Sequence, residues 1–329
     1  MIHAKQLRSF TEQIFQAIGC SESDAKLAAD VLISADLRGV DSHGVARLAG
    51  YVRLYDNGRL NPTPAIRVVH QTPSTAVVDG DRGLGLVVGP WAMQLAIEKA
   101  RVAGTGWVAV RNSNHFGIAG YHALLAAEHD MIGQAMTHAA PLVAPTFSLD
   151  KLLGTNPIAV AIPAQTEPTF VADFASTAVA YGKLEILQRE GQAIPTGWAQ
   201  DTAGNPTTDA NAVKNGGALL PLGSDREHGS HKGYGLGAIV DIFSGVLSGA
   251  NYGPWVPPFA QPVSCRPTRA LVRVPGIFSG PCASTRSAPP TNLNSIWIPG
   301  FSGFGRLKRL RVNRFWCPAT PNVWLKLSG

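Results

Sequence analysis

The stretch Val108-Ala-Val-Arg-Asn-Ser-Asn-His-Phe-Gly-Ile-Ala-Gly-Tyr121 is predicted to pass from a strand through a turn into a helix. Residues 106–110 form a short apolar run typical of a buried strand, residues 112–114 are turn formers, and residues 120–127 have apolar side chains at helical spacing. His115 therefore lies in a loop between a strand and a helix, where ligand sites of α/β proteins often occur. The alternative is a hydrogen-bonded histidine in an ordinary turn.

A second polar group lies upstream, on a helix predicted to cover about residues 41–56. His43, Arg47 and Tyr51 recur at four-residue spacing and would share one face of that helix. Arginine binds a carboxylate through two parallel hydrogen bonds, and histidine titrates near neutral pH, so it can move a proton. The group suits a small carboxylate, with Arg47 and Tyr51 as substrate-binding residues and His43 beside His115 as a catalytic candidate. The alternative is a solvated polar face.

The remaining pattern alternates helices and strands. Two amphipathic helices are predicted at residues 4–18 and 21–39, ahead of the His43 segment, and another at 90–102. Strands are predicted at 65–69, 75–79, 133–137, 158–162 and 170–174.

The composition is that of a globular protein. Hydrophobic residues make up 45% of the 329 residues, and no apolar run reaches the length of about 18 residues that a membrane span needs. The start of the chain has no apolar segment of the signal-peptide type, so we expect a cytoplasmic protein without a membrane association. The four cysteines have neither metal-ligand spacing nor a disulfide pattern, so no metal site is expected.

The glycine-rich stretch at residues 80–89 does not match the Rossmann dinucleotide fingerprint. Gly83 and Gly85 have the required spacing, but Gly89 comes one position late. Arg111 stands at the end of the following strand, where the fingerprint requires an acidic residue. We therefore interpret the stretch as a turn between ordinary elements.

Two later segments are candidates for binding a phosphate. Asp173 ends a predicted strand and is followed by small residues that open a helix within residues 175–183, and a helix N-terminus favours anions. Simple capping by Asp173 or Ser176 is the alternative. Lys232 lies at the start of an apolar helix that follows Gly229, where it would suit a phosphate or carboxylate.

The charge is divided unevenly along the chain. Residues 259–329 hold ten Lys and Arg and no Asp or Glu, whereas residues 1–258 hold 18 basic and 22 acidic residues. Helices normally carry acidic residues in their first turns, and the apolar residues of the basic segment keep no helical or strand period. We expect this segment to be poorly ordered and to result from a frameshifted end of the gene. A genuine basic extension is the alternative.

Five motifs in order resemble the malate/L-lactate dehydrogenase family, which also holds L-sulfolactate and ureidoglycolate dehydrogenases and diketogulonate reductase. The resemblance covers about residues 3–258 and rests on Arg38-Gly-Val-Asp-Ser-His-Gly-Val-Ala-Arg47, Asn112-Ser-Asn-His-Phe-Gly117, Gly154-Thr-Asn-Pro157, Asp173-Phe-Ala-Ser176 and His231-Lys-Gly-Tyr-Gly-Leu236.

The resemblance implies an NAD(P)-dependent 2-hydroxy-acid oxidoreductase with malate or oxaloacetate as the favoured substrate. NAD is the favoured cofactor and NADP the alternative. His115 matches the catalytic acid/base, His43 a second histidine of the same role, and Arg47 the arginine that binds the substrate carboxylate.

The resemblance also implies a set of cofactor-binding residues and a homodimer. The implied cofactor contacts are Thr137, His138, Asp173, Phe174, Ala175 and Lys232. The implied fold class is α+β, a non-Rossmann mixed sheet with flanking helices plus an N-terminal helical lobe. We divide the chain into a helical lobe at 1–72, an α+β cofactor and substrate lobe at 73–258, and the basic tail at 259–329.

Lactate, sulfolactate and ureidoglycolate oxidation and 2-keto-acid reduction are alternative functions within this family. Functions outside the family have weaker support in the sequence. The different class is nucleic-acid binding through the basic tail, at residues 306–311 with Arg314, Phe315 and Trp316. The acidic balance of the rest of the chain makes nucleic acid the less favoured partner.

Overall fold

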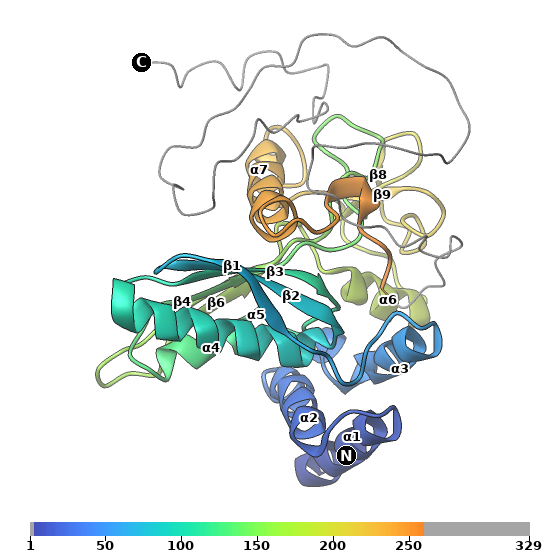
Figure 1. The fold of residues 1–329 in the computed structure, drawn as a ribbon. Helices are drawn as coiled ribbons and strands as arrows, with labels where there is room; N and C mark the ends of the chain where they lie inside the picture. The colour runs from blue at the N-terminus through green and yellow to red at the C-terminus, as the bar shows by residue number, and fades with distance from the viewer. Residues whose placement is uncertain (1–2, 260–329) are drawn as a thin grey trace, which may run out of the picture.

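The computed structural model describes residues 3–259 (Figure 1). The predictions made for the basic tail fall outside these residues, apart from Phe259. Figure 1 shows the helices α1 to α3 gathered at one end of the molecule, the longer strands in the middle, and α7 beyond them at the opposite end.

The helical end contains α1 (Ala4–Ala17), α2 (Glu22–Leu37) and α3 (Leu48–Asp56). The first two confirm the helices predicted at 4–18 and 21–39. Ser21 begins α2 because its hydroxyl accepts the backbone N–H of Asp24 at 3.1 Å, which satisfies one of the unpaired donors of the first turn.

The predicted helix at 41–56 is wrong in its first half. Residues Asp41–His43 and Val45–Arg47 form two 3-10 turns, and the α-helix begins only at Leu48. The cause is the Asp36 carboxylate, which accepts the N–H of Val45 at 3.0 Å and leaves no room for a side chain at position 44, where the sequence has glycine. His43, Arg47 and Tyr51 therefore do not share one helix face.

The first sheet is mixed. Strand β1 (Arg67–Gln71) pairs antiparallel with β2 (Thr75–Gly83), which pairs parallel with β3 (Trp107–Ser113). The parallel pair is joined by α4 (Gly85–Ala103), which begins five residues earlier than predicted, inside the glycine-rich stretch.

The second sheet is antiparallel, in the order β4 (Gly133–Met136), β5 (Ile158–Ile162) and β6 (Phe170–Phe174). Helix α5 (Ala119–Ala127) packs on it through a core made of alanines from α5, β4 and β5. Small side chains let the helix approach the strands closely.

The rest of the described chain has shorter strands than the first two sheets. It contains α6 (Tyr181–Arg189), the strands β7 (Ala199–Gln200), β8 (Pro206–Thr207) and β9 (Ala218–Leu219), and α7 (Ser230–Asp241). A π-helical turn (Ile242–Val246) and a 3-10 turn (Gly253–Trp255) follow. The α+β class is confirmed, with the strands of residues 3–259 divided among three three-stranded sheets. None of the helices in residues 3–259 is long and apolar enough to cross a membrane.

One core joins the helical end to the start of α4. Buried side chains of α1, α2 and α3, among them Phe15, Leu32 and Tyr51, pack with Leu84 and Leu86 at the start of α4. Tyr51 of α3 belongs to this core, and its hydroxyl lies 2.6 Å from Nδ1 of His115, so the core also positions α3 beside the His115 loop.

Candidate active site

His115 lies where the sequence predicted it, in the loop between β3 and α5. Its Nδ1 atom is 2.6 Å from the Tyr51 hydroxyl and accepts the backbone N–H of Gly117 at 3.2 Å. The His43 ring stacks on the His115 ring with centroids 5.6 Å apart and planes inclined by 22°. Three predicted site residues from two distant segments are therefore in contact.

The hydrogen bonds of His115 define its tautomer. Because Nδ1 accepts a backbone N–H, it carries no proton, and the Tyr51 hydroxyl donates to the same atom. The neutral ring therefore carries its proton on Nε2, the nitrogen that remains for a ligand.

Both histidines of the pair are held neutral. Burial lowers the pKa of His115 to about 3, with His43 and Arg47 adding unfavourable positive charge. Burial, and then the Arg47 charge, lowers the pKa of His43 to about 4. Tyr51 is fully buried, which raises its pKa and keeps its hydroxyl protonated. A neutral imidazole at pH 7 is able to accept a proton.

Arg47 lies near this pair but is bonded elsewhere. Its Nε donates to the carbonyl of Ser42 at 2.6 Å, and its Nη2 is 3.5 Å from a carboxylate oxygen of Glu185 on α6. Sequence analysis missed Glu185, because nothing in the pattern of α6 links it to residue 47. The guanidinium is thus pre-oriented by a backbone carbonyl and by one long ion pair.

The predicted cofactor residues of β4 and β6 meet at one edge of the second sheet. Met136, Ile158 and Phe174 are register partners across the three strands. Thr137 and His138 follow β4 at the same edge at which Phe174 ends β6 and Ala175 follows it.

The predicted helix after Asp173 begins later than expected, at Tyr181. Asp173 therefore does not precede a helix N-terminus of its own segment, and Ser176 donates to the carbonyl of Thr155 at 3.1 Å rather than capping a helix. The Asp173 carboxylate instead accepts the N–H of Gly120 at 2.7 Å, in the first turn of α5. This bond places the edge of the second sheet next to the helix that follows the His115 loop.

Asn156 ties the other candidate cofactor segments together, a role that sequence analysis did not assign. Its buried amide accepts the N–H of Ala139 at 2.9 Å and donates to the carbonyl of Gly237 in α7 at 2.9 Å. His138 lies beside this network, with Nδ1 3.0 Å from the Ser244 hydroxyl, and burial lowers its pKa to about 4. Lys232 is exposed in the first turn of α7.

These residues fit a nicotinamide dinucleotide. The edge offers an exposed aromatic ring at Phe174, 43% accessible, for stacking on a flat ring. Asp173 offers a carboxylate for ribose hydroxyls, and Lys232 offers a free-standing positive charge for a phosphate.

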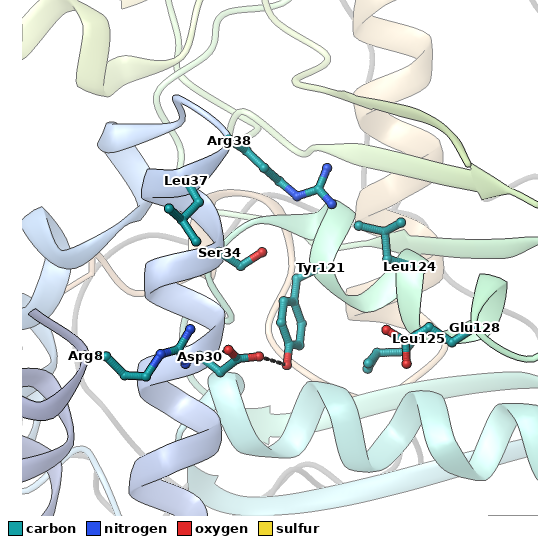
Figure 2. A pocket seen from close by; sticks show the side chains of 9 residues that line it. All are labelled: Arg8, Asp30, Ser34, Leu37, Arg38, Tyr121, Leu124, Leu125 and Glu128. Atoms are coloured by element: carbon teal, nitrogen blue, oxygen red, sulfur yellow. Dashed lines mark hydrogen bonds and ion pairs between the residues drawn. The ribbon is translucent and has the colours of Figure 1, made fainter. Parts of the chain in front are cut away.

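A separate cavity of about 400 Å³ lies between α1, α2 and α5 (Figure 2). Arg8 and the Tyr121 hydroxyl both bind the Asp30 carboxylate there, at 2.6 and 2.8 Å. No residue of the predicted site lines it, so it is distinct from the His115 cluster.

Known proteins share both the sequence and the fold. The family described as malate/L-lactate dehydrogenase matches residues 2–276, which extends beyond the end near residue 258 that the motifs indicated. A malate dehydrogenase of Pyrococcus horikoshii is 53% identical over 252 residues, 76% of this chain and 70% of the relative. An L-sulfolactate dehydrogenase of Methanocaldococcus jannaschii is 44% identical over 250 residues, 76% of this chain and 70% of the relative.

Solved structures agree. The malate dehydrogenase from Pyrococcus horikoshii OT3 superposes with a TM-score of 0.72 at 49% identity, covering 79% of this chain and 71% of that one. The malate dehydrogenase from Entamoeba histolytica superposes with a TM-score of 0.74 at 40% identity, covering 77% and 72%. The chain therefore belongs to the malate/L-lactate dehydrogenase family, and it is a dehydrogenase of the 2-hydroxy-acid type that works with a nicotinamide cofactor.

Proposed function

We propose that the chain oxidises malate to oxaloacetate with NAD, and that His115 exchanges the proton of the reacting oxygen. The observation that carries this proposal is the neutral His115, held by Tyr51 and stacked on His43, with Arg47 close enough to lower the pKa of both rings. A proton acceptor beside a fixed guanidinium is what an acid with a hydroxyl at C2 requires.

Each residue of the group has a separate role in this proposal. Arg47 binds the C1 carboxylate in place of its long contact to Glu185. For His115 to take the hydroxyl proton at Nε2 as C2 loses a hydride, its ring proton first moves from Nε2 to Nδ1, where the Tyr51 hydroxyl oxygen accepts it. The imidazolium that results returns the proton from Nε2 to the keto oxygen in the reverse direction. A bound nicotinamide supplies the hydride acceptor.

Tyr51 acts through His115 in this reading, since its hydroxyl is buried and bonded to Nδ1. A tyrosine hydroxyl is both donor and acceptor, so it can hold the neutral ring or its protonated form. His43 is the secondary histidine, placed to tune the charge of His115 rather than to replace it.

The cofactor is proposed to lie along the edge formed by Thr137, His138, Asp173, Phe174 and Ala175, with Lys232 binding a phosphate. NAD is the proposed form and NADP the alternative. We also propose that the enzyme works in the cytoplasm as a homodimer, as the family resemblance implies.

The choice of malate is supported by the relatives named malate dehydrogenase, and the relatives named L-sulfolactate dehydrogenase favour sulfolactate as the second candidate. Both acids are 2-hydroxy acids with a second negative group.

The different class of function, binding of nucleic acid, would be revealed by a salt-dependent mobility shift of DNA on addition of the protein.

The test is a panel assay of the purified full chain. Malate, sulfolactate, lactate and ureidoglycolate are each supplied with NAD and with NADP, and reduction is followed at the absorbance of the reduced nicotinamide. We expect the highest kcat/KM for malate with NAD. Failure of every acid to reduce either cofactor would overturn the proposal.

A further inference from the structure

Phe259 lies against the proposed catalytic histidine. Its ring centroid is 4.7 Å from that of His115, with the planes inclined by 35°, and 5.4 Å from that of Tyr51, with the planes inclined by 71°. The ring also packs on the core shared by the helical end and α4. No feature of the sequence marked this residue as part of the site.

The chain makes room for this ring and holds it in place. A Cβ atom at Gly50 on α3 would come within 2.8 Å of the ring carbon Cζ, so the absence of a side chain at position 50 creates the space. Arg59 donates to the carbonyl of Pro258 at 2.7 Å, and the Asp241 carboxylate accepts the N–H of Gly253 at 2.9 Å. These two bonds anchor the segment at the first residue of its 3-10 turn and again beyond the turn, next to Phe259.

The position of the ring has a consequence for any reactant. Nδ1 of His115 is occupied by Tyr51 and Gly117, so a reacting oxygen must approach Nε2. The carbon that carries this oxygen then lies within a few ångströms of the imidazole, on which Phe259 packs. A phenyl ring offers no hydrogen bond and does not yield to a larger group without cost.

We propose that Phe259 is a specificity-determining residue that forms an apolar wall of the substrate site and limits the size of the substituent on C2. This inference rests on the proposed function, because it takes His115 as the group that meets the reacting oxygen. The wall also keeps water from the imidazole, which agrees with burial as the main cause of the lowered pKa of His115.

The test compares Phe259→Ala and Phe259→Leu in the full chain. The measured quantity is the ratio of kcat/KM for 2-hydroxy-4-methylpentanoate, which carries a branched four-carbon substituent, to kcat/KM for malate. The expected increase is about tenfold or more for Phe259→Ala, the scale on which apolar pockets discriminate methylene groups, and smaller for Phe259→Leu. An unchanged ratio in both variants, with the parent active, would overturn the inference.

A second variant displaces the Phe259 ring without removing it. Gly50→Ala places a methyl group in the space of the ring and should displace it from His115, so the ratio should change in the same direction without loss of the phenyl group. Phe170→Ala is the matched control, since it removes an exposed ring from the opposite end of β6 from Phe174. A change in the control as large as in Phe259→Ala would count against a local effect.

A measurement without turnover separates this inference from the proposed function. The pKa of His115 is followed by NMR titration in the parent and in Phe259→Leu, and water reaching the ring should move it upward toward the ordinary value. A pKa that does not move would show that the ring does not shield His115. If the parent oxidises none of the acids while the pKa of His115 differs between the parent and Phe259→Leu, the proposed function fails, but Phe259 still shields His115 from water.

Discussion

The two ends of the proposed site differ in how their side chains are held. At the proton-transfer end, His115, Tyr51 and His43 contact one another, and packing fixes their positions. At the cofactor end, Phe174 and Lys232 are exposed. The first end is preorganised by the protein, whereas Phe174 and Lys232 at the second end leave contacts for the ligand to complete. Changes at the first end should therefore affect turnover, and changes at the second should affect binding.

The largest effect is expected from His115→Ala. Loss of a general base should lower kcat for malate oxidation by about a hundredfold or more. His129→Ala is the matched control, because His129 is exposed and bonded to Arg101 at the surface. Turnover near that of the parent in His115→Ala would contradict the proton-transfer role.

Arg47→Lys should raise KM for the acid substrate by about tenfold or more, because lysine keeps the charge but loses the paired hydrogen bonds. The dissociation constant for NAD, measured by fluorescence titration, should stay the same. If affinity for the nucleotide falls while that for the acid is kept, Arg47 belongs to the other end of the site.

Tyr51→Phe should lower kcat by about tenfold with little change in KM, the scale of one buried hydrogen bond. The side chain keeps its packing and loses only the donor to Nδ1 of His115. The accompanying readout is the pH profile of kcat, whose lower limb should shift if Tyr51 acts through His115. A lower kcat with an unshifted profile would assign Tyr51 a purely structural role.

Lys232→Ala should raise KM for the cofactor by about fivefold, as expected for one exposed charge, and should leave kcat unchanged. Thermal unfolding of the variant should match the parent because the side chain is exposed. A loss of kcat with cofactor binding intact would break the division between the two ends.

A further prediction concerns the dependence of stability on pH. The pKa values of His43, His122 and His138 are lowered to about 4 and that of His115 to about 3, all chiefly by burial. The unfolded chain then binds protons first, so the free energy of unfolding should fall as the pH drops below about 6.5 and continue to fall toward pH 3.

Three carboxyls act in the opposite sense. Burial raises the pKa of Asp36, Asp173 and Asp241, the last to about 6, so their protonation favours the folded state, and the Asp241 contribution is lost as the pH rises through about 6. Denaturant titrations from pH 8 to pH 4 measure the balance. Stability that increases steadily on acidification would contradict the histidine contribution.

Most helices and strands of the described chain could be predicted, because their signals are local. Period, caps and turn residues gave β5 and β6 at their observed bounds and α1 and α2 to within two residues. The helix through His43 failed because its competitor, the Asp36 carboxylate bonded to Val45, is a tertiary contact. The start of α4 was missed because glycines at a helix start resemble a loop.

The candidate site divides in the same way. His115 could be proposed because it is a titratable side chain in a turn-forming segment, and His43 because it recurs at four-residue spacing with Arg47 and Tyr51; both also match the family's motifs. Glu185, Asn156 and Phe259 could not, since each meets its partner across more than 80 residues or through a network that only the fold assembles. The Asp173 carboxylate bonds to Gly120 rather than within its own segment, and this long-range contact could not be predicted from the sequence either.

The core that α1, α2 and α3 share with the start of α4 makes the proposed active site a reporter of folding. Tyr51 belongs to that core and also bonds to His115, so His115 keeps this partner as long as the core stays folded. Loss of turnover in a denaturant series should then coincide with the spectroscopic unfolding of the helical end, and an assay of activity would follow cooperative melting without any added probe.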